Sequence, residues 1–341
     1  MRHTELMGAK VRSYVANARG RDDGRGVLIT TTLPFALCPT PSACTKPTKF
    51  YLWDRSHLFS EIHRFKALLG NLYDPGEASS ITNLVFEEVL KLTMHQLRFS
   101  GERGITEEEH QQLDDILHRL LAIEPIQYIL GFAWFMNVRY KVNAATLIPR
   151  PETEELVAWI VNHPIKQGAR ILDLGTGSGC IAIEVQRKHP YAEVFAIDKS
   201  VSAINTARMN ALEFLGESKK DHFFVQDMLD ESWWKGLEKF DIIVSNPPYV
   251  LEEEKEEMEA HVLNHEPEGA LFVPNDDPFQ FYRPIAENAK RQLNSGGSIY
   301  FEINAKFGEE MKSMLELLGY EVELRLDMQG KHRMIRANLR S

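Results

Sequence analysis

The sequence predicts a small all-α helical domain followed by an α/β domain with a Rossmann-like, doubly wound sheet and a terminal antiparallel hairpin. Apolar residues recur at helical spacing between residues 53 and 125, which indicates packed helices. From residue 169 onward, short apolar runs alternate with helical segments, as in folds built from βαβ units. A glycine-rich turn at residues 175–179 follows the first of these runs, where doubly wound folds bind ligands.

The first 52 residues differ from the rest and are predicted to be a disordered extension. Residues 19–26 are rich in Arg, Gly and Asp, and prolines interrupt residues 34–47. We expect this extension to have no folded role; an organellar leader and a signal peptide are the alternatives. The remaining chain is long enough for two domains at ~150 residues each.

Charge and cysteine content favour a cytoplasmic enzyme without a metal. Residues 1–50 hold eight Lys or Arg and three Asp or Glu, and residues 51–341 hold 31 against 46, a net charge of −15. A region with this negative charge is expected to bind nucleic acid poorly, because phosphate contacts need basic side chains. Cys38, Cys44 and Cys180 form neither a CxxC nor a Cys/His cluster, which favours a reducing compartment. Residues 27–38 are too short for a membrane span, and we expect a monomer that binds no membrane.

Residues 53–125 are predicted to form a small helical bundle. Apolar side chains recur at spacings of three and four in three stretches: Leu58, Ile62, Phe65, Leu68 and Leu69; Leu84, Val85, Val89 and Leu92; and Leu113, Ile116, Leu117, Leu120 and Leu121. Thr106 and Glu109 have the spacing of a capping box, which predicts the start of the last helix. We interpret the three stripes as the core of the bundle.

Residues 126–150 are predicted to link the two domains. Val138, Tyr140 and Val142 alternate with polar residues, which predicts a hairpin strand. Pro151 followed by acidic residues predicts a helix start. Arg150 and Glu152 are the side chains here that could border a site, although a capped helix alone explains the pattern equally well.

The α/β domain is expected to cover residues 151–341. The expected strands are 169–174, 194–198, 222–225, 240–244 and 298–303, with helices at 180–187 and 200–212 and an alanine- and lysine-rich helix before residue 298. Residues 322–326 and 334–339, on either side of Gln329-Gly330, predict the terminal hairpin. The site is expected at the carboxyl ends of the strands.

The turn Asp173-Leu174-Gly175-Thr176-Gly177-Ser178-Gly179 predicts a loop that binds S-adenosylmethionine. Its glycines let the backbone approach a ligand closely, with a helix N-terminus facing it. An NAD-binding loop is the alternative, but this loop lacks the GxGxxG helix contact of dinucleotide folds. Asp198 is expected to accept both ribose hydroxyls, Asp227 to meet the adenine amine, and Met228 to line the adenine ring.

Residues Asn246-Pro247-Pro248-Tyr249 predict a rigid loop that holds a planar NH2 group. An amide or exocyclic amine is a poor nucleophile, but two fixed acceptors can hold its two N–H donors. Asn246 can offer its side-chain oxygen and Pro247 its backbone carbonyl, since prolines fix φ and remove competing donors. Tyr249 can wall the planar group and attract a sulfonium-bound methyl group. Asn246, Pro247 and Tyr249 are therefore the candidate catalytic residues, all four residues are candidates for substrate binding, and Asn246 also borders the cofactor.

These motifs together resemble the HemK/PrmC family, the peptide-chain release factor N5-glutamine methyltransferases, over residues 54–339. The shared signatures are Gln127 to Gly131, Ile148-Pro149-Arg150-Pro151-Glu152-Thr153-Glu154, Asp173 to Gly179, Ser245 to Tyr249, Glu266-Pro267 with Ala270-Leu271, and Gly330 with Arg333. Many nucleic-acid methyltransferases share the loop at 246–249. The stretch at 148–154 after a helical domain is more specific.

The resemblance implies an S-adenosylmethionine-dependent methyltransferase, with S-adenosylhomocysteine as a product. It implies that residues 175–179, Asp198 and Met228 contact the cofactor, and that residues 246–249 hold the glutamine of a Gly-Gly-Gln loop in a release factor. The helical domain is expected to recognise that protein. This sequence departs from the family pattern at residues 272–277, where a glycine-rich segment is expected, and at Met228, where the residue is often aromatic. Adenine packing and partner fit can therefore differ.

The remaining sequence features indicate no further catalytic or metal-binding residues. The acidic run at 252–259 is interpreted as a solvated helix, or otherwise as a lip near the substrate opening. His265 has no partner residue for nucleophilic or metal chemistry nearby in the sequence. Cys180 is interpreted as a small buried residue rather than a nucleophile.

Three functions compete at this point. The first is a glutamine methyltransferase acting on release factors, and the second is an N-methyltransferase acting on adenine or guanine in DNA or RNA. The third is a cofactor-binding interaction module without turnover. The charge of −15 weighs against the second, and the intact acceptors at Asn246 and Pro247 weigh against the third.

Overall fold

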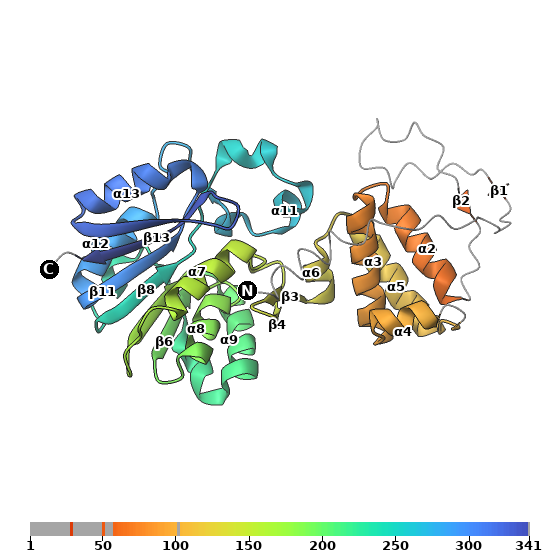
Figure 1. Cartoon of the computed structure of the whole chain (residues 1–341), viewed down its shortest axis with the longest axis horizontal. Helices are drawn as coiled ribbons and strands as arrows, with labels where there is room; N and C mark the ends of the chain where they lie inside the picture. The colour runs from red at the N-terminus through yellow and green to blue at the C-terminus, as the bar shows by residue number, and fades with distance from the viewer. Residues whose placement is uncertain (1–27, 30–49, 52–56, 101–102, 340–341) are drawn as a thin grey trace. The chain divides into compact units, whose positions relative to one another are not determined.

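The computed structural model describes residues 28–29, 50–51, 57–100 and 103–339. The chain divides into two units, residues 1–126 and 127–341, whose elements are shown in Figure 1. Apart from the antiparallel pair of β1 (Leu28–Ile29) and β2 (Phe50–Tyr51), the predicted disordered extension at 1–52 lies outside the described residues. The predicted domain boundaries stay predictions.

The first unit is helical, as the periodicity predicts. It contains α2 (Leu58–Leu69), α3 (Pro75–Leu90), α4 (Met94–Phe99) and α5 (Glu107–Leu121). The predicted capping box is confirmed, because the Glu109 N–H donates to the Thr106 hydroxyl and the Thr106 N–H donates to the Glu109 carboxylate. Phe65 of α2 packs edge to face on Phe86 of α3, with ring centroids 5.0 Å apart.

The apolar stripe predicted for α3 is partly wrong. Of the predicted set, Val85 is buried, whereas Leu84 and Val89 are only half-buried. Leu92 lies beyond the end of the helix. The buried face of α3 instead follows the helical repeat from its proline start through Ala78, Ile81, Val85, Phe86 and Leu90.

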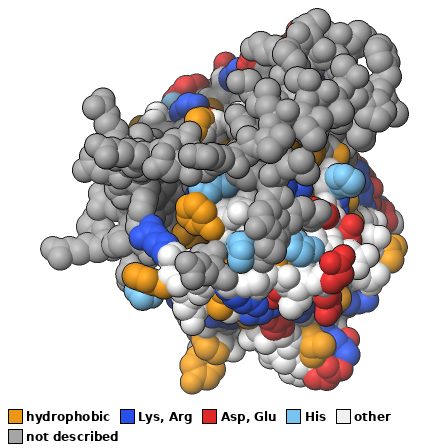
Figure 2. Space-filling view, turned by 90° about the vertical axis from the view of Figure 1, so that its right-hand side faces the viewer, with side chains coloured by type: hydrophobic (Ala, Val, Ile, Leu, Met, Phe, Trp, Pro, Cys, Tyr) orange, Lys and Arg blue, Asp and Glu red, His pale blue; other side chains and the backbone are white. Residues whose placement is uncertain are grey.

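Aromatic side chains remain exposed on the helical unit. Phe59 is 61% exposed and Phe99 is 78% exposed, and each contacts a histidine ring on its own helix. Figure 2 shows hydrophobic, histidine and acidic side chains together on one face of the protein.

The second unit is built on a seven-stranded sheet with the order β12-β13-β11-β8-β5-β6-β7. Its strands are β5 (Arg170–Leu174), β6 (Glu193–Asp198), β7 (Phe223–Val225), β8 (Phe240–Ser245), β11 (Leu293–Glu302), β12 (Tyr320–Leu326) and β13 (His332–Leu339). The strands from β7 to β11 are parallel, whereas β13 pairs antiparallel with both β11 and β12. The predicted doubly wound sheet and terminal hairpin are confirmed.

Helices cover both faces of this sheet (Figure 1). One core lies under α7 (Pro151–Val161), α8 (Cys180–Lys188) and α9 (Val201–Leu215). The other lies under α10 (Glu231–Trp234), α12 (Tyr282–Gln292) and α13 (Gly308–Leu317). Because both faces are buried, the central strands are continuous apolar runs, which is why they could be recognised from the sequence.

The strand predicted at 298–303 begins earlier than expected. β11 starts at Leu293, and its pairing with β8 shifts register between Leu293 and Ser298. Gly296, in this irregular stretch, has a φ of +77°. The Asn-Ser-Gly-Gly sequence has the composition of a turn, although here it forms a bulged strand.

Smaller elements complete the second unit and its linker. They are α6 (Ile126–Leu130), the antiparallel pair β3 (Phe132–Phe135) and β4 (Val138–Lys141), the parallel pair β9 (Val250–Leu251) and β10 (Phe272–Val273), α11 (Ala260–His265), and 3₁₀ turns at Glu217–His222, Glu252–Glu257, Glu268–Ala270 and Ala305–Phe307. The hairpin predicted around Tyr140 is confirmed. Among the described residues, no helix is both long and apolar enough to cross a membrane.

The acidic run at 252–259, predicted as a solvated helix, forms a short and mostly exposed 3₁₀ helix over Glu252–Glu257. The half-buried Glu254 folds back on the start of this helix and accepts the N–H of Leu251. Glu254 also accepts a hydrogen bond from Asn304 and pairs with Lys306. The run is therefore tied to the segment after β11.

Candidate active site

The glycine-rich loop follows β5 and is held against the neighbouring strand. The N–H groups of Gly175 and Thr176 both donate to the Ile197 carbonyl of β6 at 2.9 Å. Gly175, Gly177 and Gly179 have φ values of +72°, +56° and +84°, which side-chain-bearing residues rarely adopt. The sequence needs glycine at these positions because the loop must reverse direction before α8 begins.

Asp198, at the end of β6, bridges the glycine loop and the next helix. Its carboxylate accepts the Gly177 N–H at 3.0 Å and the Ser200 N–H at 2.9 Å. Burial raises the pKa of the Asp198 carboxyl, while the two backbone hydrogen bonds and Lys199 lower it. The structure thus places Asp198 at the strand end where a ribose-binding carboxylate was predicted.

A pocket of about 230 Å³ opens at the carboxyl ends of β5, β6 and β8. The predicted cofactor residues that line it are Gly175, Thr176, Gly177, Ser178, Asp198, Asp227, Met228 and Asn246. Gly179 is not among the lining residues. A Cβ on Gly179 would lie 3.0 Å from Ile183 and 3.2 Å from Ala207, so this glycine allows α8 and α9 to pack closely.

Two buried polar atoms beside the glycine loop have no protein partner within the described residues. They are Oδ1 of Asp173 and the hydroxyl of Ser178, a residue that also lines the pocket. The other Asp173 oxygen accepts from the Thr176 hydroxyl at 2.6 Å. Unpaired buried polar atoms are costly, and a polar ligand in the pocket can satisfy the hydroxyl of Ser178.

The loop at 246–249 leaves the end of β8 and is anchored on both sides. The Ser245 hydroxyl donates to the Leu174 carbonyl at 2.7 Å, and the Tyr249 N–H donates to the Leu271 carbonyl at 3.2 Å. Asn304 donates to the Tyr249 carbonyl at 3.1 Å. Pro247 and Pro248 are buried between these anchors. Asn246 and Pro248 line the pocket, whereas Pro247 and Tyr249 do not.

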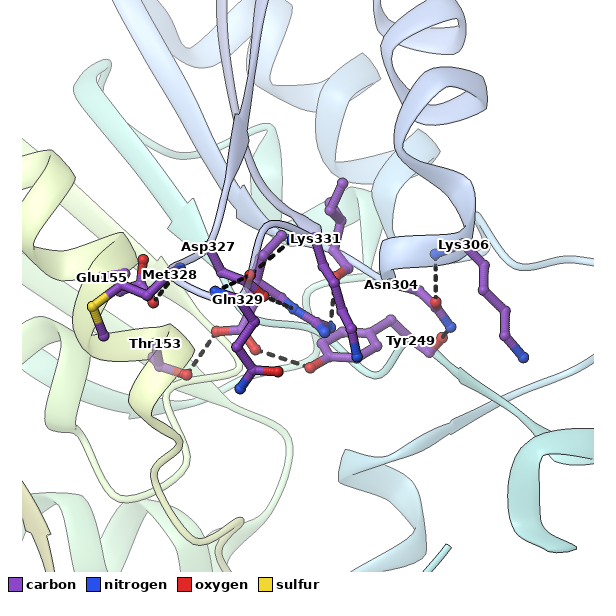
Figure 3. Close-up of polar contacts among 12 residues, drawn as sticks. Thr153, Glu155, Tyr249, Asn304, Lys306, Asp327, Met328, Gln329 and Lys331 are labelled. Atoms are coloured by element: carbon purple, nitrogen blue, oxygen red, sulfur yellow. Dashed lines mark hydrogen bonds and ion pairs between the residues drawn. The ribbon is translucent and has the colours of Figure 1, made fainter. Parts of the chain in front are cut away.

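Tyr249 and Asn246 are joined through two residues that the sequence analysis assigns no role. The Tyr249 hydroxyl donates to one oxygen of Glu302 at 2.9 Å, and the Thr153 hydroxyl donates to the other at 2.6 Å. Figure 3 shows Thr153 and Tyr249 pointing from two sides toward the carboxyl group between them. Asn246 in turn donates from Nδ2 to the Thr153 oxygen at 3.2 Å. Thr153 is part of the conspicuous 148–154 stretch, which is the one signal that could have drawn attention to it.

The electrostatics of this cluster keep Tyr249 protonated. Burial, followed by the nearby Glu302 carboxylate, raises the pKa of Tyr249 well above its ordinary value. Burial also raises the pKa of Glu302, while hydrogen bonds from Thr153 and Tyr249 and the charge of Arg333 lower it. Tyr249 is therefore a hydrogen-bond donor to Glu302 rather than a base.

Arg150 holds a loop that borders the pocket. Its guanidinium donates to Glu266 at 2.6 Å, and Glu266 also accepts the Ile148 N–H at 3.2 Å. Glu266 is buried, and Pro267 beside it lines the pocket. This ion pair joins the 148–154 stretch to the segment after α11. Cys180, as expected, is buried, and burial raises the pKa of its thiol to about 12.

Two protein-family models match this chain. The family described as "Methyltransferase small domain" matches residues 153–272, and the "PrmC N-terminal domain" matches residues 62–131. The chain is 42% identical to the release factor glutamine methyltransferase of Bacteroides thetaiotaomicron, covering 79% of this chain and 96% of that protein. It is 40% identical to that of Flavobacterium psychrophilum, covering 81% and 97%. Among solved structures, a protein-(glutamine-N5) methyltransferase (release factor-specific) from Alicyclobacillus acidocaldarius is 26% identical, with a TM-score of 0.36 over 57% of this chain and 95% of that one.

The doubly wound sheet, with its glycine loop and the Asn-Pro-Pro-Tyr loop bordering one pocket, is that of an α/β methyltransferase. At this level of identity over nearly the whole length of its relatives, the chain belongs to the release factor glutamine methyltransferase family.

Proposed function

We propose that this chain binds S-adenosylmethionine in the pocket and methylates the side-chain amide nitrogen of a glutamine in a peptide chain release factor. The observation that carries the proposal is the position of Asn246, which lines the same pocket as Gly177 and Asp198. An amide-holding side chain and a cofactor loop thus border one cavity. The family membership identifies the amide as that of glutamine.

The residues of the pocket fit the proposed cofactor. Gly177 has open space where a Cβ would stand, so a ligand can approach its backbone. Asp198 keeps lone pairs for ribose hydroxyls beyond its two backbone contacts. Ser178 offers an unpaired hydroxyl within the described part of the chain. Met228 provides an apolar side chain against the glycine loop, where an adenine ring can pack.

The cofactor would supply a methyl group activated by the positive sulfonium. Asn246 Oδ1 and the Pro247 carbonyl would hold the two N–H groups of the glutamine amide, so that its nitrogen faces that methyl. Transfer of the methyl group would form the nitrogen–carbon bond and break the sulfur–carbon bond, and the nitrogen would then release a proton to water. The anchored prolines fix the backbone acceptor before the substrate arrives, which lowers the cost of orienting it.

The helical unit is proposed to dock the release factor. A single amide offers little contact area, whereas specific recognition between proteins usually buries on the order of 1,200–2,000 Å² in total. Docking outside the pocket would supply that area and place the glutamine. The Gly-Gly-Gln loop is the segment that we propose enters the site.

The test is methyl transfer from labelled S-adenosylmethionine to purified release factor, followed by mass spectrometry of the loop peptide. Label is expected on the loop glutamine and absent from a variant with that glutamine changed to alanine. Duplex DNA and RNA serve as competing substrates. Label on nucleic acid, or on the glutamine-free variant, would refute the proposal and favour the nucleic-acid alternative.

A further inference from the structure

A chain of hydrogen bonds leads from Glu302 to the amide of Asn246. The Thr153 hydroxyl donates to Glu302 Oε2 at 2.6 Å, and Asn246 Nδ2 donates to Thr153 Oγ1 at 3.2 Å. Thr153 lies in the first turn of α7, and Glu302 is the last residue of β11. Thr153 and Glu302 are both almost fully buried. The helix α7 and the strand β11 therefore hold this series of hydrogen bonds in place.

The direction of these hydrogen bonds is fixed by chemistry. An ionised carboxylate can only accept, and a threonine hydroxyl has a single hydrogen to donate. Since Glu302 takes that hydrogen, Thr153 can offer Asn246 only a lone pair. Asn246 must then turn its NH2 group toward Thr153, which leaves its Oδ1 facing away.

We propose that Thr153 and Glu302 are positioning residues that hold the Asn246 amide in the orientation that presents Oδ1 to the substrate. The proposal rests on the proposed function, in which Asn246 must act as an acceptor. The two flipped orientations of an amide have nearly the same shape, so packing alone cannot choose between them. In the wrong orientation, the NH2 group of Asn246 would face the N–H groups of the glutamine, and two donors would oppose each other.

The surroundings of Glu302 support its role as an acceptor. Tyr249 donates to its second oxygen at 2.9 Å, so each carboxylate oxygen receives one hydroxyl. Burial raises the pKa of Glu302, and the hydrogen bonds from Thr153 and Tyr249 together with the positive charge of Arg333 on β13 oppose that rise. Tyr282 donates to the Glu302 backbone carbonyl at 2.9 Å, which fixes the strand end from the other side. Because each oxygen of the buried Glu302 carboxylate accepts a hydrogen bond, the hydroxyl groups of Thr153 and Tyr249 both act as donors.

The experiment compares Thr153→Val, Thr153→Ser and Glu302→Gln with the unmodified chain, using labelled S-adenosylmethionine and intact release factor. Valine keeps the shape of threonine but removes the hydroxyl, and glutamine at 302 can donate to Thr153 and reverse the chain of bonds. We expect kcat to fall roughly 10- to 100-fold in Thr153→Val and Glu302→Gln, since misaligned groups lose rates of this order. The KM for release factor and the Kd for S-adenosylmethionine should stay within about threefold, because ground-state binding is retained. Serine restores the hydroxyl, and Thr153→Ser should stay within about threefold of the original kcat.

Thr82→Val is the matched control, because Thr82 is also a buried helical threonine, and its hydroxyl donates to the Ala78 carbonyl in the helical unit. It reports the cost of losing a buried hydroxyl away from the site, and thermal unfolding of every variant shows whether it folds. Should Glu302→Gln fail to fold, the two Thr153 variants decide. An unchanged kcat in Thr153→Val, or Thr153→Ser as slow as Thr153→Val, would overturn the positioning role alone. Absence of transfer by the unmodified chain would instead overturn the proposed function.

Discussion

The carboxylate of Asp198 accepts the backbone N–H of Gly177 at 3.0 Å, which joins the end of β6 to the loop after β5. Its other oxygen accepts the Ser200 N–H at 2.9 Å at the start of α9. One side chain therefore shapes the cofactor loop and also faces the pocket that the loop borders. The geometry of the loop and the proposed binding of the ligand would therefore depend on the same carboxylate.

Asp198→Ala is expected to weaken S-adenosylmethionine binding by about 1.5–3 kcal/mol, the usual contribution of hydrogen bonds to a charged group. The variant leaves the ribose hydroxyls without their acceptor. Isothermal titration calorimetry measures the effect. Asp230→Ala is the control, because Asp230 is exposed and accepts only short-range hydrogen bonds at the start of α10. Equal affinities for Asp198→Ala and the unmodified chain would contradict the assignment.

Asn246→Ala is expected to lower kcat more than it lowers cofactor affinity. The side chain acts as a preorganised acceptor, and the loss of one such group costs on the order of 10²–10³ in rate. Asn246→Asp keeps an acceptor oxygen but adds charge, so partial activity is expected. Single-turnover transfer to release factor measures the step. Asn71→Ala, at an exposed helix end of the first unit, should behave as the unmodified chain does. Full turnover by Asn246→Ala would show that the amide is held in another way.

Gly179→Ala should mainly lower folding stability, whereas Gly177→Ala should mainly weaken cofactor binding. Both positions have positive φ, and an alanine there costs about 1–2 kcal/mol of folding free energy. At Gly179 the added Cβ also meets Ile183 at 3.0 Å, and overpacking of this kind costs about 1–3 kcal/mol more. At Gly177 the Cβ has open space, so its main effect should be weaker cofactor binding. Denaturant unfolding and calorimetry together distinguish the two, and equal stability losses would contradict the packing argument.

Asp173 should make folding stability depend on pH. Burial raises its pKa from 3.8 to about 7. Between these values the folded protein keeps a proton that the unfolded chain has released, so the free energy of unfolding falls as the pH rises. The fall should be roughly 1.4 kcal/mol per pH unit at most. Asp173→Asn cannot titrate, and its free energy of unfolding should change less over this window. Denaturant curves at several pH values test this, and parallel pH dependences would refute it.

Removal of residues 1–125 should separate cofactor binding from protein recognition. The second unit has apolar cores on both faces of its sheet, formed from its own residues, so it should still bind S-adenosylmethionine. Methylation of intact release factor should drop sharply, whereas removal of residues 1–50 should change little. Unchanged methylation by the shorter chain would show that the helical unit has no part in docking.

The sequence predicts the α/β fold well because its signals are local. The buried strands at 170–174 and 240–245 are short apolar runs, and the glycine and proline motifs at their ends require special backbone geometry. Asn246 could be assigned because it directly follows such a strand, and Asp198 because it is the last residue of another. The register shift in β11 could not be predicted, since Gly296 and Gly297 have the composition of a turn.

The hydrogen bond between Thr153 and Glu302 could not be predicted from the sequence, for a different reason. These residues are 149 positions apart, and their contact depends on the order of strands in the finished sheet. A buried glutamate at a strand end also carries no pattern of its own. Gly179 shows a further point that the motif alone does not reveal, because this glycine also allows α8 and α9 to pack closely.

The neighbouring positions of β5 and β8 have a consequence for how the protein assembles. Leu172 pairs with Ile243, so the centre of the sheet joins two strands that are separated in the sequence by β6 and β7. Pairings between distant segments of this kind make folding slow. The loops that follow both strands border the same pocket, so the pocket depends on this one long-range pairing. Any opening that detaches β8 would therefore displace Asn246 and Pro248 from the pocket wall.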